Sequence, residues 1–118
     1  IDDDEINQMI LQGMLRNKQY RYLKAKTGEE GLGYCSGQSE PPDLIMLDCS
    51  LPDMTGFDVC KRIRTLYSKN QVPIVMLSAR HNEKAVVEGL ACGANDYVTK
   101  PFKRNELAER IRAQLRAR

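Results

Sequence analysis

The sequence has little of what a zinc, membrane or nucleic-acid-binding protein needs. Its 118 residues include a single histidine, His81, and four cysteines without CxxC spacing, so no zinc site is indicated. No apolar run approaches the roughly 20 residues that cross a bilayer. The net charge of +2 is too small to indicate direct binding to nucleic acid. We interpret the cysteines as reduced thiols of a cytoplasmic protein that does not contact a membrane.

The length and composition fit one globular domain. Hydrophobic residues make up 42% of the chain and charged residues 29%, which is typical of a folded protein. Single hydrophobic cores commonly form in chains of about 100 to 150 residues. We therefore expect residues 1–118 to form one domain.

Short apolar runs alternate with segments of helical period. Continuous apolar runs are typical of strands buried on both faces of a parallel sheet. They are residues 44–47, which end at Asp48, residues 74–77, which end at Ser78, and residues 97–99, which end at Lys100.

Between and around these runs, apolar residues recur every three or four positions, which predicts amphipathic helices. The sequence Thr27-Gly28-Glu29-Glu30 has the form of a capping box, which predicts the start of a further short helix. This alternation predicts right-handed βαβ units, and so an α/β fold with a doubly wound, five-stranded parallel sheet and helices on both faces. The helical patterns cover residues 6–14, 59–66, 86–90 and 107–115.

The strand expected before the first helix is nearly missing. Only Ile1 precedes the run Asp2-Asp3-Asp4. Because a stable sheet of this kind needs its central strand, we expect the native chain to extend upstream of Ile1 and the sequence to be a fragment of a longer protein.

Polar residues follow the strands at the edge where ligands bind in open α/β sheets. They are Asp2 and Asp3 after the first strand, Asp48 after the third, Ser78 after the fourth and Lys100 after the fifth. We expect all five to share one pocket.

Carboxylates that lie close together repel one another unless a proton or a cation offsets their charge. Mg²⁺ prefers oxygen ligands and usually keeps several waters. We predict a Mg²⁺ site with Asp2 or Asp3 and Asp48 as ligands, together with the backbone carbonyl of Ser50.

An aspartate can attack phosphorus and form an acyl phosphate, and Asp48 has the position for this reaction. The cation and the Lys100 ammonium would neutralise the transferring oxygens, while the Ser78 hydroxyl would donate a hydrogen bond to one of them.

Four segments carry a resemblance to the CheY-like receiver domains of response regulators, which have a flavodoxin-like fold. They are residues 1–7, 48–56, 78–80 and 94–102, and the resemblance spans nearly the whole chain. Asn7 favours Asp2 and Asp3 as the acidic pair of the family, and Asp3 with Asp4 is the alternative.

The resemblance implies that Asp48 takes its phosphoryl group from the phosphohistidine of a sensor histidine kinase or of a histidine phosphotransfer protein, with Mg²⁺ required. It implies that Ser78 and Tyr97 form the switch, and that the peptide bond between Lys100 and Pro101 is cis. The remaining implied roles are those of Ser50 and Arg80, which would tune the lifetime of the acyl phosphate.

The C-terminal part is similar to receivers of the OmpR/PhoB type. These form homodimers through the fourth helix, the fifth strand and the fifth helix, and Asp96, Glu106 and Arg110 match ion-pair partners of that face. The sequence departs from the pattern at Val86, where a basic residue is expected, and at Ala91, where an acidic one is expected. The resemblance also implies a covalently attached output domain.

Two other functions compete with this interpretation. A metal-dependent phosphatase with an aspartate nucleophile would need a second acid two residues later, where Ser50 stands. A receiver-like domain that docks partners without being phosphorylated usually lacks the acidic pair, the acceptor or the lysine, and this sequence has all of them. We expect a domain that is not an enzyme beyond its own phosphorylation and dephosphorylation.

Overall fold

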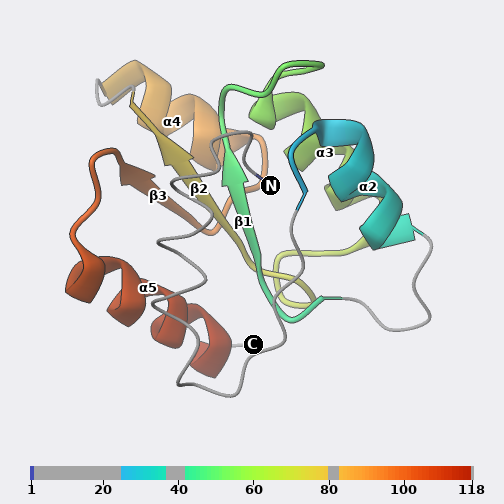
Figure 1. Ribbon diagram of the computed structural model, residues 1–118. Helices are drawn as coiled ribbons and strands as arrows, with labels where there is room; N and C mark the ends of the chain where they lie inside the picture. Colours follow the sequence, from blue (N-terminus) through green and yellow to red (C-terminus); the bar gives the residue numbers. More distant parts are fainter. Residues whose placement is uncertain (2–24, 37–41, 80–82, 118) are drawn as a thin grey trace.

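The computed structural model describes residues 1, 25–36, 42–79 and 83–117 (Figure 1). The predicted first helix, with Asn7, lies outside these residues. The described elements are α2 (Gly28–Ser36), β1 (Ile45–Asp48), α3 (Gly56–Leu66), β2 (Ile74–Ser78), α4 (Glu83–Ala91), β3 (Asp96–Thr99) and α5 (Arg104–Ala117).

The described strands form a parallel sheet in the order β1, β2, β3. Ile1 continues this sheet on the other side of β1. Its amino group donates to the Met46 carbonyl at 2.6 Å, and its carbonyl accepts from the Asp48 amide at 2.9 Å. This is the bonding pattern of a parallel pair, with Ile1 opposite Leu47. The predicted parallel α/β sheet is confirmed, and the described residues contain three of the five strands that the sequence predicts.

Side chains that alternate along the strands supply two cores, one on each face of the sheet. Leu47, Ile74 and Met76 pack toward α2 and α3, whereas Val75 and Leu77 pack toward α5 with Leu107 and Ile111. Figure 1 shows α5 on the opposite side of the sheet from α2 and α3. The doubly wound arrangement explains why residues 74–77 are apolar without interruption, because both faces of β2 are covered.

Side-chain oxygens cap the N-termini of two helices. Thr27 Oγ1 accepts from the Glu30 amide at 3.1 Å, which confirms that Thr27 caps the predicted helix, α2. Thr55 Oγ1 accepts from the Asp58 amide at 3.2 Å and so caps α3. Each cap satisfies an amide that the helix itself leaves unpaired.

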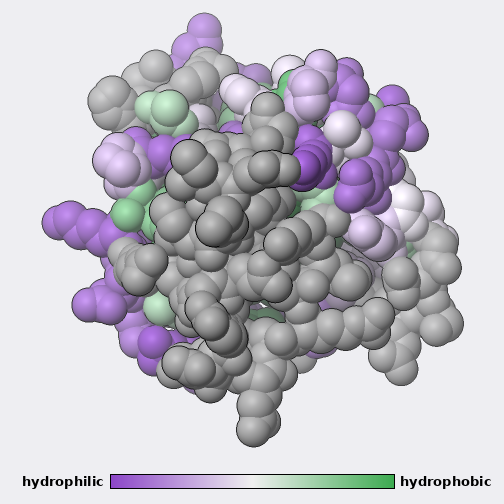
Figure 2. Space-filling model, in the orientation of Figure 1, coloured by the Kyte–Doolittle hydropathy of each residue, from purple (hydrophilic) through white to green (hydrophobic). Residues whose placement is uncertain are grey.

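The helical spacing located α4 but did not predict which of its apolar residues are buried. Val87 is 58% exposed and Leu90 is 41% exposed, while Val86 packs against the core. The reason is that α4 meets the sheet through Gly89, whose missing side chain leaves room for the Tyr97 ring. In Figure 2, apolar side chains of the described residues form only small, separate areas on the visible face. No helix in the described part of the chain has the length and apolar character of a membrane span.

Candidate functional site

Asp48 ends β1 and is only 6% exposed. Its Oδ1 accepts a hydrogen bond from the Ser50 amide at 3.1 Å, and its Oδ2 lies 3.1 Å from Lys100 Nζ. Burying a carboxylate costs free energy unless a charge or a hydrogen-bond donor compensates it. Here the Ser50 amide compensates Oδ1, and the Lys100 ammonium compensates Oδ2. The carboxylate is therefore held in a fixed orientation at the carboxyl end of its strand.

The register of the sheet brings Lys100 and Ser78 to the same edge. Asp48 pairs with Leu77 and Ser78 pairs with Thr99, so the three strands end side by side. The Lys100 amide donates to the Ser78 carbonyl at 2.7 Å, and the peptide bond from Lys100 to Pro101 is cis, as predicted. Ser78 is 3% exposed. The structure thus brings together Asp48, Ser78 and Lys100, which the sequence assigned to one pocket.

The loop after β1 is anchored where it begins and where it ends. The Gly56 amide donates to the Cys49 carbonyl at 2.8 Å, and Ser50 and Thr55 form an antiparallel bridge. A side chain at Gly56 would overlap the Asp48 carbonyl, so glycine lets α3 begin directly against the strand end. This packing fixes Ser50 beside the carboxylate.

Asp53, in the same loop, has a role that the sequence did not reveal. Its carboxylate accepts from the amides of Gly28 at 2.8 Å and Glu29 at 3.0 Å and so gives α2 a second cap. These hydrogen bonds hold the pKa of Asp53 below its ordinary value of 3.8. The cap ties the loop to a helix 25 residues away, a contact for which no local sequence signal exists.

The predicted acidic pair, Asp2 with Asp3, and Arg80 lie outside the described residues. Within the described ranges, no group of three or more histidine, cysteine or acidic side chains is placed to hold a metal. The donors that are described, the Asp48 carboxylate and the Ser50 carbonyl, are hard oxygens of the kind that Mg²⁺ prefers. Asp2 and Asp3 follow Ile1 directly in sequence, and Ile1 pairs with β1 one residue before Asp48.

Tyr97 and Cys49 lie beside the site in the core. Tyr97 is 8% exposed, and its ring packs against Gly89. Burial raises the pKa of the Cys49 thiol, while hydrogen bonds with Ser78 and Tyr97 oppose that rise. Cys49 therefore contacts both residues of the predicted switch. Sequence analysis missed it, although its position next to Asp48 was a signal.

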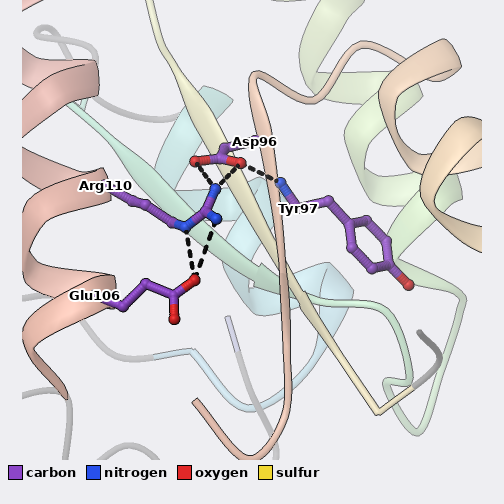
Figure 3. A network of polar contacts seen from close by, with 4 residues as sticks. All are labelled: Asp96, Tyr97, Glu106 and Arg110. Atoms are coloured by element: carbon purple, nitrogen blue, oxygen red, sulfur yellow. Dashed lines mark hydrogen bonds and ion pairs between the residues drawn. The ribbon is translucent and has the colours of Figure 1, made fainter. Parts of the chain in front are cut away.

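The three predicted dimer-face residues pair within one chain (Figure 3). Arg110 Nη1 lies 2.8 Å from Asp96 Oδ1 and 3.0 Å from Oδ2, and Arg110 Nη2 lies 3.1 Å from Glu106 Oε1. Asp96 Oδ1 also accepts from the Tyr97 amide at 2.8 Å. Asp96 is the leading cause of a raised pKa at Arg110. The network joins β3 to α5 next to Tyr97, whose ring points away from it.

The fold is a parallel α/β domain with a buried aspartate at the end of one strand, paired with a lysine that follows another. The chain matches the response regulator receiver domain over residues 1–112, and it belongs to that family. It is therefore a receiver domain, and its similar proteins include regulators such as PhoB.

Two curated relatives are similar over 98% of the chain. The transcriptional regulatory protein AfsQ1 of Streptomyces coelicolor is 44% identical, and the alkaline phosphatase synthesis transcriptional regulatory protein PhoP of Bacillus subtilis is 42% identical. The matches cover 49% and 47% of those proteins, so the chain spans about half their length. A crystal structure of a two-component response regulator from Clostridium difficile is 30% identical with a TM-score of 0.88, covering 98% of this chain and 91% of that one.

Proposed function

We propose that Asp48 accepts a phosphoryl group from the phosphohistidine of a sensor histidine kinase or of a histidine phosphotransfer protein. One observation carries the proposal: a buried carboxylate is held between the Ser50 amide and the Lys100 ammonium at the edge where the strands end. Ligands of open α/β sheets bind at this edge. Membership of the receiver family supports the same assignment.

In the proposed reaction, an oxygen of Asp48 attacks the phosphorus of the donor. The new P–O bond forms as the P–N bond breaks, and the imidazole leaves with the electron pair. Lys100 faces the carboxylate and would neutralise charge on the transferring oxygens, which is the main requirement of phosphoryl transfer. The Ser78 hydroxyl would donate to one of these oxygens. The domain would catalyse only its own phosphorylation and dephosphorylation.

Magnesium would be held by the Asp48 carboxylate, the Ser50 carbonyl and the acidic residues Asp2 and Asp3. When bound, it would offset the repulsion between carboxylates and phosphoryl oxygens. Ser50 and Arg80 would line the mouth of the pocket and tune how long the acyl phosphate survives.

Phosphorylation adds a charge of roughly −1.5 to −2 beside Asp48, which would bias the region around Ser78 and Tyr97. Tyr97 is buried against Gly89 of α4, and Asp96 next to it pairs with Arg110 of α5. Any change at Tyr97 would therefore reach the face made by α4, β3 and α5. We propose that this face controls an output domain of a longer cytoplasmic protein, because the curated relatives are about twice as long as the match.

A homodimer through that face would need Asp96, Glu106 and Arg110 to exchange their partners. In the present structure each acid pairs with Arg110 of its own chain. The Arg110–Glu106 pair is exposed and contributes little to stability, so exchanging it would cost little. The Arg110–Asp96 pair is bidentate and partly buried, so exchanging it would cost more. Val86 and Ala91 still offer no ion pair.

Incubation of the chain with Mg²⁺ and acetyl phosphate, followed by intact mass spectrometry, tests the proposal. We expect a gain of one phosphoryl group that is absent without Mg²⁺ and absent in Asp48→Asn. Asp58→Asn, which changes an exposed aspartate of α3, is the matched control and should react like the parent. A phosphoryl gain that survives Asp48→Asn would overturn the assignment. No gain in the folded parent chain would favour a docking module that is not phosphorylated.

A further inference from the structure

Two thiols that the proposed phosphoryl chemistry does not use meet on one side of the sheet. Cys60 comes from α3, and Cys92 follows the end of α4. Cys60 Sγ donates to the Cys92 carbonyl at 3.5 Å, so the two cysteines are in direct contact. Cys92 Sγ also lies 3.0 Å from the Gly89 carbonyl, to which it donates.

Contacts that do not involve sulfur hold these two segments together. Arg64, one turn after Cys60, donates from Nε to the Gly93 carbonyl at 2.8 Å. Gly93 has a φ of +114°, and a side chain there would overlap the Arg64 side chain. Since Gly93 follows Cys92 directly, the Arg64 contact fixes Cys92 beside α3. The proximity of the thiols is therefore built into the fold.

The two thiols differ in character. Cys60 is completely buried, whereas Cys92 is partly exposed. The interaction with Cys60 lowers the pKa of Cys92, whereas the interaction with Cys92 and burial raise the pKa of Cys60. The charged groups that act on the pair are the cations Lys61, Arg64 and Lys69, which favour a thiolate. Low pKa, partial exposure and a neighbouring second thiol are the properties of cysteines that react with oxidants.

We propose that Cys60 and Cys92 are a modification site at which a hydroperoxide forms a disulfide between α3 and the connection from α4 to β3. The Cys92 thiolate attacks one peroxide oxygen, the O–O bond breaks, and hydroxide or alkoxide leaves, which gives a sulfenic acid. The Cys60 sulfur then displaces the sulfenic oxygen. For hydrogen peroxide, two thiols and one peroxide yield one disulfide and two waters.

The disulfide would act on the part of the fold that carries Tyr97. Oxidation removes the hydrogen bond from Cys92 Sγ to the Gly89 carbonyl, and Gly89 packs directly against the Tyr97 ring. It also replaces a hydrogen-bonded contact between α3 and the end of α4 with a covalent bond. The end of α4 would then be restrained independently of phosphorylation.

The test treats the full chain with hydrogen peroxide, without phosphodonor, and measures intact mass and peptide linkage. We expect the loss of two hydrogen atoms, a linkage between Cys60 and Cys92, and full reversal by dithiothreitol. Cys92→Ser should form no intrachain disulfide. Cys60→Ser should instead gain one oxygen, on Cys92, that dimedone traps. Cys35→Ser is the matched control, since Cys35 is buried elsewhere in the core, and it should react like the parent.

A disulfide that includes Cys35 or Cys49, or one that still forms in Cys60→Ser, would overturn the proposal. So would a parent chain that keeps its mass at peroxide concentrations that oxidise Cys92 in Cys60→Ser. If Cys60→Ser does not fold, alkylation of the native parent chain decides the question. Iodoacetamide should label Cys92 at least about tenfold more than Cys35 at neutral pH, and equal labelling would contradict the proposal.

Discussion

The two ends of the parallel sheet each hold a partly buried cation, but the cations have different kinds of partner. At the carboxyl end, Lys100 faces the carboxylate of Asp48. At the amino end, Arg64 donates to the carbonyls of Gly93 at 2.8 Å and Val72 at 2.7 Å, and to Asn95 Oδ1 at 2.8 Å. The first pair joins two charges that a ligand could separate. The second network joins a charge to neutral acceptors, two of them backbone carbonyls at the start of the sheet.

This difference separates a site from a structural clamp. Asn95 Oδ1 also accepts from the amide of Ile74, the first residue of β2, so the Arg64 network closes the start of that strand. Burial lowers the pKa of Arg64, yet its donors meet several neutral acceptors. Hydrogen bonds from a charged donor to neutral acceptors stabilise the fold, and the acceptors carry no group that would react. We expect changes at the carboxyl end to affect chemistry first, and changes at the amino end to affect folding first.

Lys100→Met gives the largest expected effect on chemistry. Loss of the ammonium should slow phosphorylation of Asp48 by acetyl phosphate on the order of 100-fold, because one stabiliser of the transferring oxygens is gone. Urea unfolding should show a loss of about 2 kcal/mol in the free energy of unfolding, because the buried carboxylate of Asp48 has lost its cation. Lys103→Met, an exposed neighbour, is the control. If Lys100→Met is phosphorylated at the rate of the parent, Lys100 has no chemical role, and the carboxyl end of the sheet does not differ from the amino end in this respect.

Arg64→Ala should have the opposite profile. We expect a loss of about 3 kcal/mol in the free energy of unfolding, since the change removes the Arg64 hydrogen bonds to the part-buried carbonyls of Gly93 and Val72. The phosphorylation rate of the folded fraction should change less than about threefold, which is about 0.7 kcal/mol. Arg62→Ala, on the exposed side of the same helix, should unfold like the parent. A large change in the phosphorylation rate with an unchanged free energy of unfolding would contradict a structural role for Arg64.

The contribution of the Asp53 cap on α2 to stability should depend on pH, unlike that of the Arg64 clamp. Because the folded pKa of Asp53 lies below its ordinary value of 3.8, its carboxylate stabilises the fold at higher pH. That contribution is lost as pH falls through the folded pKa. The parent should therefore be more stable than Asp53→Asn near neutral pH, and urea unfolding should show the gap closing in acid below 3.8. A gap that is independent of pH would mean that the charge has no part in the cap.

Arg110→Ala should give the smallest effect. The Arg110 side chain is 40% exposed and that of Glu106 is 51% exposed, so water and salt screen their pair. Urea unfolding should show a loss of about 1 kcal/mol, and the part that comes from Glu106 should shrink in high salt, whereas the part from the less exposed Asp96 should persist. A loss as large as that of Arg64→Ala would show that exposure does not separate the two arginines.

The sequence predicted well those features that depend on local pattern and strand order. The apolar runs before Asp48 and Ser78 located β1 and β2, and the parallel topology then brought Lys100 to Asp48. Asp48 itself proved to be the last residue of its strand rather than the first residue of the loop.

Contacts between distant segments could not be predicted. The hydrogen bonds that Arg64 donates to Asn95 and that Gly28 donates to Asp53 each join residues 25 or more positions apart, and they depend on how the helices pack against the rest of the fold. An arginine in an amphipathic helix gives no sign of whether it points to solvent or to the end of a strand. The same holds for Arg110, because its sequence position fits a partner in another chain and one in its own.

Gly89 has a spectroscopic consequence. Because only a glycine separates the backbone of α4 from the Tyr97 ring, the helix and the ring cannot change position separately. The chain has no tryptophan, so its ultraviolet emission comes from five tyrosines alone. Replacing the other four with phenylalanine would leave Tyr97 as the single tyrosine, so its fluorescence would report changes in the position of α4.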